Sequence, residues 1–401
     1  MPGKSRGHRH QLVIVGGGFG GAACAKAALN DRIDVTVIER RSHQEFQPLL
    51  YQVATGAVSP DALRIPTRAV LPSGVRLIRD VVLRVDAVSQ TVHTAEEALS
   101  YDSLVVAAGA FVETPKLFPE ALPLKDVADA VTLRDHLFDQ LTIAYDEHDE
   151  TAATVVIVGG GPTGVELAGE IRRLALSELA DSPLIPRVIL VEQSDRLLPG
   201  FSRRASIAAE EALDRLGIEV RLEATIESTS PHRYEIRGTR GTATVDSGTL
   251  VWAAGVRPSA LVDTLGPLDE LGRVRVDSKC RVMDQPNVWA IGDAARFEGD
   301  DETLPWVAAV AMQQGAYVGR SIQRYQLGRR VAPFRYSDRG MIAHVGDRVA
   351  VGDVLGVPLE GIAPWLLAEL VHLFFLPGIE NRLLAATDFI ASYLGRRRRP
   401  S

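Results

Sequence analysis

Short apolar runs that end in glycines occur twice along the chain, and each predicts a buried parallel strand. Residues 11–15 (QLVIV) and 154–158 (TVVIV) are rich in β-branched side chains, and each runs directly into a glycine-rich loop. After each loop the pattern predicts a helix and then a second strand, over residues 22–29 and 34–38 in the first copy and over 165–176 and 188–191 in the second. The chain therefore contains two strand–loop–helix–strand units.

Both loops fit the spacing G-x-G-x-x-G, with Gly16, Gly18 and Gly21 in the first and Gly159, Gly161 and Gly164 in the second. In a dinucleotide-binding unit the first glycine permits a tight turn, the second lets the backbone approach a pyrophosphate, and the third lets helix and strand pack closely. The helix N-terminus faces the phosphates.

An acidic residue ends the second strand of each unit, Glu39 in the first and Glu192 in the second, where a carboxylate accepts hydrogen bonds from a ribose. A lone glycine motif is weak evidence, and a turn without a ligand is the alternative. The complete order of parts occurs twice, however. Two dinucleotide sites imply one flavin and one nicotinamide nucleotide.

Composition narrows the function classes. The chain has 401 residues, of which 46% are hydrophobic and 24% charged, which suggests two or three globular domains. A net charge of -7 argues against a nucleic-acid binder, although the last residues include Arg396 to Arg399. Two cysteines supply neither a disulfide framework nor a cysteine metal cluster, and we expect no metal site. No apolar run is long enough to predict a transmembrane helix.

Three later segments indicate which nucleotide binds where. Residues 101–109 and 250–258 read as strands that end in tight turns at Gly109 and Gly255. Residues 287–295 (NVWAIGDAA) resemble the strand–Gly–Asp segment of flavoprotein disulfide-reductase-like enzymes. That resemblance implies that Gly292 and Asp293 lie at FAD, with the Asp293 carboxylate on the ribityl chain. A helix N-cap is the alternative role for Asp293.

The first unit is then the FAD-binding domain, and the NADH-binding domain is inserted between its two halves. We expect the FAD domain at residues 11–118 and 259–330, the NADH domain at 119–258, and a C-terminal region at 331–401. Glu192 accepts from a 2′-hydroxyl and repels a 2′-phosphate, which favours NADH over NADPH. Arg196 would soften that preference if it reached the ribose; a solvated loop arginine is the interpretation we favour.

The segment after the first unit excludes a dithiol relay. Residues 46–56 (FQPLLYQVATG) hold no cysteine, whereas disulfide reductases and sulfide:quinone reductases need a pair. This segment, residues 159–171 (GGGPTGVELAGEI) and the tail around 365–367, 371–376 and 381–384 closely resemble type II NADH dehydrogenases. The resemblance runs from about residue 11 to 394, and its most specific parts are FQPLLYQVATG and the tail.

The resemblance implies an α/β flavoenzyme that passes a hydride from NADH to FAD and then two electrons to a membrane quinone, without pumping protons. It places Glu166 near flavin and nicotinamide; a carboxylate that favours the helix dipole is the alternative. It also implies that a helix after Pro305 points its N–H groups at the flavin. On that helix Gln313 matches the second glutamine of the family's A-Q-x-A-x-Q pattern, but Ala309 replaces the first and Trp306 is unusual. This departure puts the quinone site in doubt.

The tail predicts two helices at a membrane surface. Residues 361–377 are strongly apolar but too short to span a bilayer, and residues 379–394 carry apolar side chains on one face. Such helices fit peripheral binding at the cytoplasmic face of the cell membrane. Packing in the core or in a homodimer is the alternative. His372 and Arg382 are candidates for contact with quinone or lipid headgroups, and a satisfied structural His372 is the interpretation we favour.

Two other functions compete with a membrane NADH:quinone oxidoreductase. A soluble NADH-dependent reductase of a ferredoxin-like protein would explain Ala309 but not the apolar tail. A flavoprotein that senses NADH without turnover is disfavoured, because both glycine motifs are intact.

Overall fold

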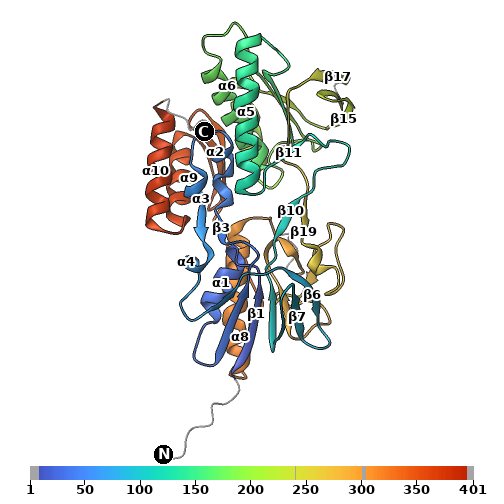
Figure 1. The fold of residues 1–401 in the computed structure, drawn as a ribbon, viewed down its shortest axis with the longest axis vertical. Coiled ribbons are helices and arrows are strands. Elements are labelled where there is room, and N and C mark those ends of the chain that lie inside the picture. Colours follow the sequence, from blue (N-terminus) through green and yellow to red (C-terminus); the bar gives the residue numbers. More distant parts are fainter. Residues whose placement is uncertain (1–8, 240, 300–303, 395–401) are drawn as a thin grey trace, which may run out of the picture. The chain divides into compact units, whose positions relative to one another are not determined.

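The computed structural model describes residues 9–239, 241–299 and 304–394. Arg396 to Arg399, the basic run near the end of the sequence, lie outside the described residues. The chain forms two compact units (Figure 1). The first unit contains Met1–Gln44, Ile65–Phe111 and Val256–Ser337, and the second contains Glu45–Arg64, Val112–Gly255 and Asp338–Ser401.

A five-stranded parallel sheet forms the centre of the first unit, and the first predicted strand–loop–helix–strand unit lies within it. Its order is β21-β9-β1-β2-β5, with bounds Val288–Ala290, Ser103–Val106, His10–Val15, Ile33–Ile38 and Arg76–Ile78. Apolar clusters cover both faces, because strands that are buried on both sides carry apolar residues at successive positions.

The second unit has a sheet of the same kind. Its order is β11-β18-β12-β13-β14, with bounds Leu122–Pro123, Thr249–Trp252, Thr154–Val158, Arg187–Val191 and Glu219–Arg221. The expected α/β fold with two Rossmann-like domains is confirmed. The helices after the two glycine loops begin three residues earlier than predicted, since α1 spans Phe19–Ala28 and α6 spans Pro162–Glu178.

Two long-range contacts fix the helices that follow the loops. In the first unit α1 packs against α8 (Ala308–Gln326), where a Cβ added at Gly315 would lie 2.1 Å from the Gly20 carbonyl oxygen. In the second unit α6 packs against β23 (Met341–Gly346), where a Cβ at Gly169 would lie 1.8 Å from the Val345 carbonyl oxygen. Backbone-to-backbone packing at these points needs glycine.

Smaller elements complete each unit. The first unit adds α4 (Thr67–Val70) and the strand groups β6-β7-β8 (Val82–Asp86, Thr91–Thr94, Ala98–Ser100) and β20-β22 (Val274–Val276, Ala295–Phe297). The second unit adds β15-β16-β17 (Ala224–Ser230, Arg233–Gly238, Gly241–Asp246), β24 (Val349–Val354) and β25 (Val357–Gly361), and the helices α2 (Leu50–Ala54), α3 (Pro60–Leu63), α5 (Val127–Glu147) and α7 (Arg203–Arg215).

The tail folds into α9 (Ile362–Phe375) and α10 (Ile379–Tyr393), the red helices of Figure 1. Both belong to the second unit, together with β23, β24 and β25, so the structure does not set residues 331–401 apart as a separate body. None of the helices within the described residues has the length and apolar character needed to cross a membrane.

Candidate functional site

The first glycine loop has the geometry of a phosphate cradle. A Cβ at Gly21 would lie 1.8 Å from the Gly16 carbonyl oxygen, so helix and loop approach each other as closely as the motif requires. A Cβ at Gly18 would meet no atom within 4 Å. The Gly18 backbone therefore borders open space at the N-terminus of α1, where a pyrophosphate is stabilised by N–H groups and the helix dipole.

Glu39 is held in place by the backbone around this loop. One carboxylate oxygen accepts from the Gly17 N–H at 2.6 Å and the other from the Arg41 N–H at 2.9 Å. Glu39 and Gly16 line a hollow of about 290 Å³ that also borders Ala108 and Ser259. Gly109, at a φ of +65°, turns the chain beside this hollow. The cradle, the anchored acid and the hollow fit the adenosine half of FAD.

The second loop repeats this geometry within the second unit. A Cβ at Gly164 would lie 1.8 Å from the Gly159 carbonyl oxygen, and a Cβ at Gly161 would meet no atom within 4 Å. Glu192 accepts from the Gly160 N–H at 2.6 Å and from the Ser194 N–H at 2.7 Å. These groups fit a second dinucleotide, and Gly255, at a φ of +67°, lies in the turn that follows the neighbouring strand β18.

Arg196 has its guanidinium bound to backbone carbonyls of its own loop. It donates to the Pro199 oxygen at 2.6 Å and to the Phe201 oxygen at 3.3 Å. A guanidinium held in this way serves the loop, because both of its terminal nitrogens donate to loop carbonyls. This arrangement favours the structural role of Arg196 over contact with a 2′-phosphate.

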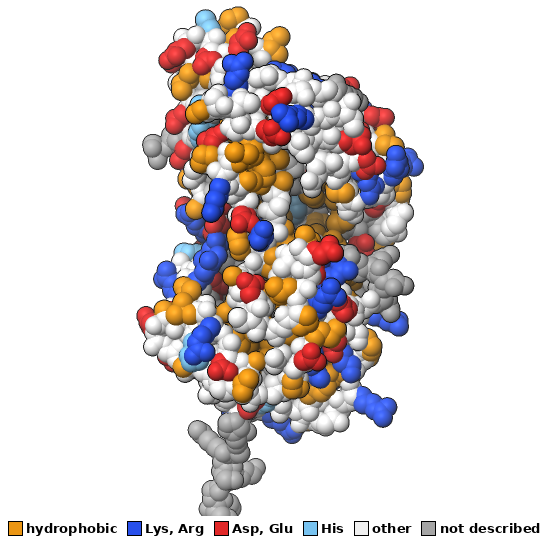
Figure 2. Space-filling view, turned by 90° about the vertical axis from the view of Figure 1, so that its right-hand side faces the viewer, with side chains coloured by type: hydrophobic (Ala, Val, Ile, Leu, Met, Phe, Trp, Pro, Cys, Tyr) orange, Lys and Arg blue, Asp and Glu red, His pale blue; other side chains and the backbone are white. Residues whose placement is uncertain are grey.

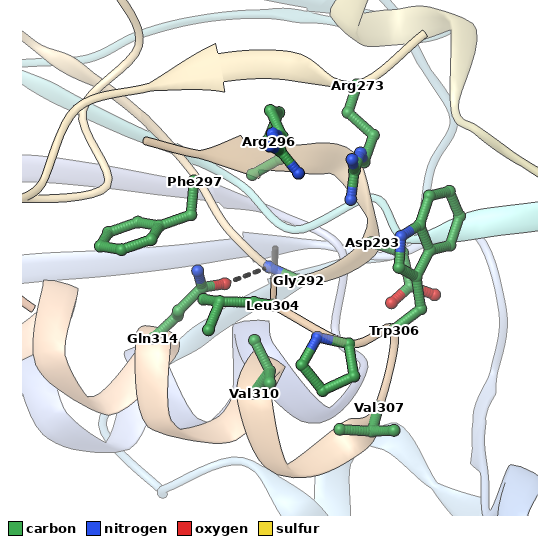
Figure 3. A pocket seen from close by; sticks show the side chains of 12 residues that line it. Arg273, Gly292, Asp293, Arg296, Phe297, Leu304, Trp306, Val307, Val310 and Gln314 are labelled. Atoms are coloured by element: carbon green, nitrogen blue, oxygen red, sulfur yellow. Dashed lines mark hydrogen bonds between the residues drawn. The ribbon is translucent and has the colours of Figure 1, made fainter. Parts of the chain in front are cut away.

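Gly292 and Asp293 lie in the turn that connects β21 to the short strand β22 (Figure 3). Gly292 has a φ of +66°, and its N–H donates to the Gln314 side-chain oxygen at 2.7 Å. Asp293 and Trp306 border a small, narrow hollow at the N-terminal end of α8. The open end of α8 and the carboxylate beside it fit the polar flavin end of FAD.

Gln314 is a functional candidate that sequence reasoning missed, and Gln313 lies differently from expectation. Gln313 is half-buried, and its amide both donates to and accepts from the Ser337 backbone, at 3.0 and 2.9 Å. Gln314 is buried on the apolar stripe that includes Val310 and Val318. A polar residue on such a stripe signals a buried hydrogen bond. Ala309 is exposed in the first turn of α8, so its position has room for a larger side chain.

Glu166 lies beyond the first turn of α6, because the helix begins at Pro162. The alternative role for Glu166, a carboxylate that favours the helix dipole, is therefore less well supported, since the dipole effect falls off within one turn. Its Oε1 accepts from the His344 N–H at 3.4 Å. Desolvation of the carboxyl group, with a smaller contribution from Glu369, raises the pKa of Glu166 to about 8 although the His344 N–H opposes the shift. The group is therefore a proton donor at neutral pH.

The two tail helices turn apolar side chains outward and polar ones inward. The predicted apolar face of α10 is mostly exposed, and on α9 the side chain of Phe374 is 68% exposed. Glu369 and Asp388 are buried instead, and Asp388 accepts from the Ser59 N–H at 2.9 Å. The alternative prediction, that the apolar faces of these helices pack in the core of this unit, is therefore wrong. Exposed large apolar residues on the two helices are Ile362, Leu366, Leu367, Leu370, Val371, Phe374, Phe375, Ile379, Leu383, Ile390 and Leu394.

The surface drawn in Figure 2 is mixed in character, unlike the apolar face of the two tail helices. There, acidic and basic side chains are scattered among apolar ones, and no large patch of a single charge gathers on this face. A nucleic-acid binder needs a basic stripe or patch.

Comparison with known proteins places the chain among flavin- and pyridine-nucleotide-dependent enzymes. Residues 10–315 match the family described as pyridine nucleotide-disulphide oxidoreductase. A type II NADH:quinone oxidoreductase of Mycobacterium tuberculosis is 34% identical, over 97% of this chain and 89% of that protein. One from Staphylococcus aureus is 27% identical, over 88% of this chain and 92% of that protein.

A solved structure has the same fold over nearly its whole length. It is the structure of NDH2 from Plasmodium falciparum in complex with NADH, with a TM-score of 0.87 and 20% sequence identity. The match covers 96% of this chain and 98% of that one.

Proposed function

The chain belongs to the pyridine nucleotide-disulphide oxidoreductase family and, within it, to the type II NADH:quinone oxidoreductases, and we propose that it oxidises NADH at a membrane surface and reduces quinone there. The observation that supports this most is the pair of complete dinucleotide cradles, one in each unit, each with an anchored carboxylate. One cradle serves FAD and the other NADH.

FAD, when bound, accepts a hydride from NADH and passes electrons on to quinone. The protein's part is to bind and orient. Glu39 and the first loop hold the adenosine half of FAD, and Asp293 and Gly292 hold its ribityl and flavin end. Glu192 accepts from the ribose of NADH. In the first unit, the N–H groups of α8 and Gln313 provide polar contacts at the flavin end of FAD. In the second unit, Glu166 holds a proton at neutral pH.

The exposed face of α9 and α10, defined by the eleven apolar residues named above, supports attachment to a bilayer. Burying one large apolar side chain is worth about 1.5–3 kcal/mol, so several together suffice for peripheral binding. We place this attachment at the cytoplasmic face of the cell membrane. A homodimer that covers the same face is the other way to bury it.

The test uses the full-length holoenzyme and vesicles that contain anionic lipid and quinone. NADH oxidation is measured with quinone, with a ferredoxin and with oxygen as acceptors, and vesicle binding is measured by flotation. We expect quinone to be the fastest acceptor and most of the protein to float. Fast reduction of ferredoxin with no reduction of quinone would establish the soluble reductase instead.

A double variant, Leu370→Ser with Phe374→Ser, tests the tail face. It should weaken vesicle binding about tenfold or more, since two exposed apolar side chains lose their burial. Leu271→Ser is the matched control, because Leu271 is a similarly exposed leucine in the first unit. A double variant that floats like the unchanged protein but has lost a dimer would assign the face to self-association.

A further inference from the structure

Helix α9 buries its polar side chains, and Glu369 is the most buried of them. Its carboxyl group is 5% exposed and lies between α2 and β23. It accepts from the Gln52 side-chain nitrogen at 2.8 Å, and His344 Nδ1 lies 3.6 Å away. The other side of α9 faces outward, and a carboxyl group placed there would avoid the free-energy cost of desolvation. Its position inside therefore needs an explanation.

Two histidines continue from Glu369 toward the outside of the unit. The His344 ring is buried and lies nearly parallel to the His372 ring, with centroids 6.0 Å apart and planes at 24°. His372 is half-buried. Among the described residues, neither His344 Nε2 nor His372 Nδ1 has a hydrogen-bond partner. Leaving a buried polar atom unpaired costs about 1–3 kcal/mol, which indicates a use other than stability.

A fourth residue, Glu166, is connected to these three side chains because its carboxyl group accepts from the backbone N–H of His344. We call Glu166, His344, Glu369 and His372 the α9 cluster. It brings together side chains from α6, β23 and α9, all in the second unit. A half-buried acid lies at one end and a half-buried histidine at the other, with Glu369 and His344 between them.

Burial is the main reason that the cluster is neutral. Burial, and then the nearby Glu170, raise the pKa of Glu369 to about 8 against the opposing Gln52 hydrogen bond. Burial lowers the pKa of His344 to about 4 and that of His372 to about 3. Glu170 itself is paired with Arg173 at 2.7 Å. The remaining titratable neighbours are two tyrosines with raised pKa values, Tyr51 and Tyr393.

Quinone reduction needs a proton that NADH does not supply. The balance is NADH + H⁺ + quinone → NAD⁺ + quinol. The hydride carries two electrons and one proton, whereas the quinone takes up two of each. The second proton comes from water, and a site shielded by a membrane or by packed protein needs titratable groups to bring it in.

We propose that Glu369 stores this proton and that His372 and His344 refill it from solvent. The inference rests on the proposed function, because only a proton-consuming acceptor requires it. On release, the Glu369 O–H bond breaks and its proton goes to the reduced quinone oxygen, directly or by way of Glu166. The carboxylate then takes the proton on His344 Nδ1 while His344 Nε2 gains one that His372 has received from solvent, so that neither ring loses a proton without gaining another. Glu369 is thus a proton-transfer residue rather than one that binds NADH or FAD.

The experiment compares Glu369→Gln with the unchanged holoenzyme, using two acceptors. Glutamine keeps the shape and can still accept from Gln52, but it cannot release a proton. With quinone, kcat should fall at least about tenfold, since positioned proton transfer contributes more than that. With ferricyanide, which takes an electron and no proton, the rate should not change. Stopped-flow reduction of the flavin by NADH should not change either.

The pH profile separates proton transfer from a structural role. In the unchanged enzyme, kcat with quinone should fall as pH rises past about 8, because Glu369 then loses the proton that it donates. In Glu369→Gln the rate should already be low at neutral pH, so the fall past about pH 8 should be much smaller, and what remains of it reports Glu166, whose pKa is also about 8. Glu380→Gln, an exposed glutamate at the start of α10, is the control and should behave like the unchanged enzyme.

A second variant covers the case in which Glu369→Gln fails to bind FAD. His372→Gln should slow quinone reduction and leave ferricyanide reduction intact, and added imidazole should restore part of the rate. The proposal is overturned if the variants that keep FAD show unchanged kcat and an unchanged pH profile with quinone. If the unchanged protein reduces ferricyanide but no quinone, the proposed function itself fails, and this proposal fails with it.

Discussion

The two glycine-rich loops are nearly the same device placed in different surroundings. In both, the third glycine approaches the first so closely that an added Cβ would lie 1.8 Å from a carbonyl oxygen. In both, a glutamate at the end of the next strand accepts a loop N–H at 2.6 Å. The similarity extends to single hydrogen bonds and supports the proposal that each loop binds a dinucleotide.

The surroundings differ in the helix that follows. Helix α1 packs through small residues against α8 within the first unit, and its buried positions are glycine, alanine and cysteine. Helix α6 carries Glu166 and Glu170 and packs against β23, which holds His344. The loop therefore determines that a dinucleotide binds, and the helix face determines which chemistry is available beside it.

The largest expected effect comes from a matched pair, Gly21→Ala and Gly164→Ala. Each methyl group would collide with a carbonyl oxygen in its own loop, and overpacking of this kind costs about 1–3 kcal/mol or more. Gly21→Ala should lose FAD and with it every activity. Gly164→Ala should keep FAD and raise the KM for NADH at least about tenfold.

FAD content after gel filtration and the KM for NADH distinguish the two variants. If Gly164→Ala lost FAD and Gly21→Ala kept it, the assignment of the two nucleotides to the two loops would have to be reversed.

A smaller effect is expected at the ribose of NADH. Glu192→Gln keeps the acceptor oxygen but removes the charge that repels a 2′-phosphate, so the ratio of kcat/KM for NADH over NADPH should fall by about tenfold. Arg196→Gln is the control. Its guanidinium is bound to the Pro199 and Phe201 carbonyls, so the ratio should not change. A fall in NADPH use in the Arg196 variant would show instead that this arginine binds the phosphate.

The local features of the fold were predictable, because they depend on residues that are neighbours in the sequence. Apolar runs such as residues 154–158 and the glycine spacing after them require nothing from the rest of the chain. The start of α6 was missed by three residues because Pro162, which favours the first position of a helix, was read as part of the loop. Contacts between residues that are far apart in the sequence could not be predicted in this way.

The α9 cluster shows where sequence reasoning ended. Gln52 and Glu369 are 317 positions apart, and no local pattern connects them. The segment 361–377 was interpreted as strongly apolar, and its sequence alone does not show which side of the helix Glu369 faces. Only the packing of α9 against β23 and β24 shows that Glu369 points inward. His372 was interpreted as a satisfied structural histidine, but its Nδ1 has no hydrogen-bond partner among the described residues.

The most direct test of the account follows the bound flavin through both half-reactions in one stopped-flow experiment. The oxidised holoenzyme on quinone-containing vesicles is mixed with one equivalent of NADH in the absence of oxygen. The yellow colour should bleach as NADH is consumed and then return as quinone is reduced, and without quinone it should stay bleached. Colour that returns only when a ferredoxin is added, with quinone inert, would contradict the account.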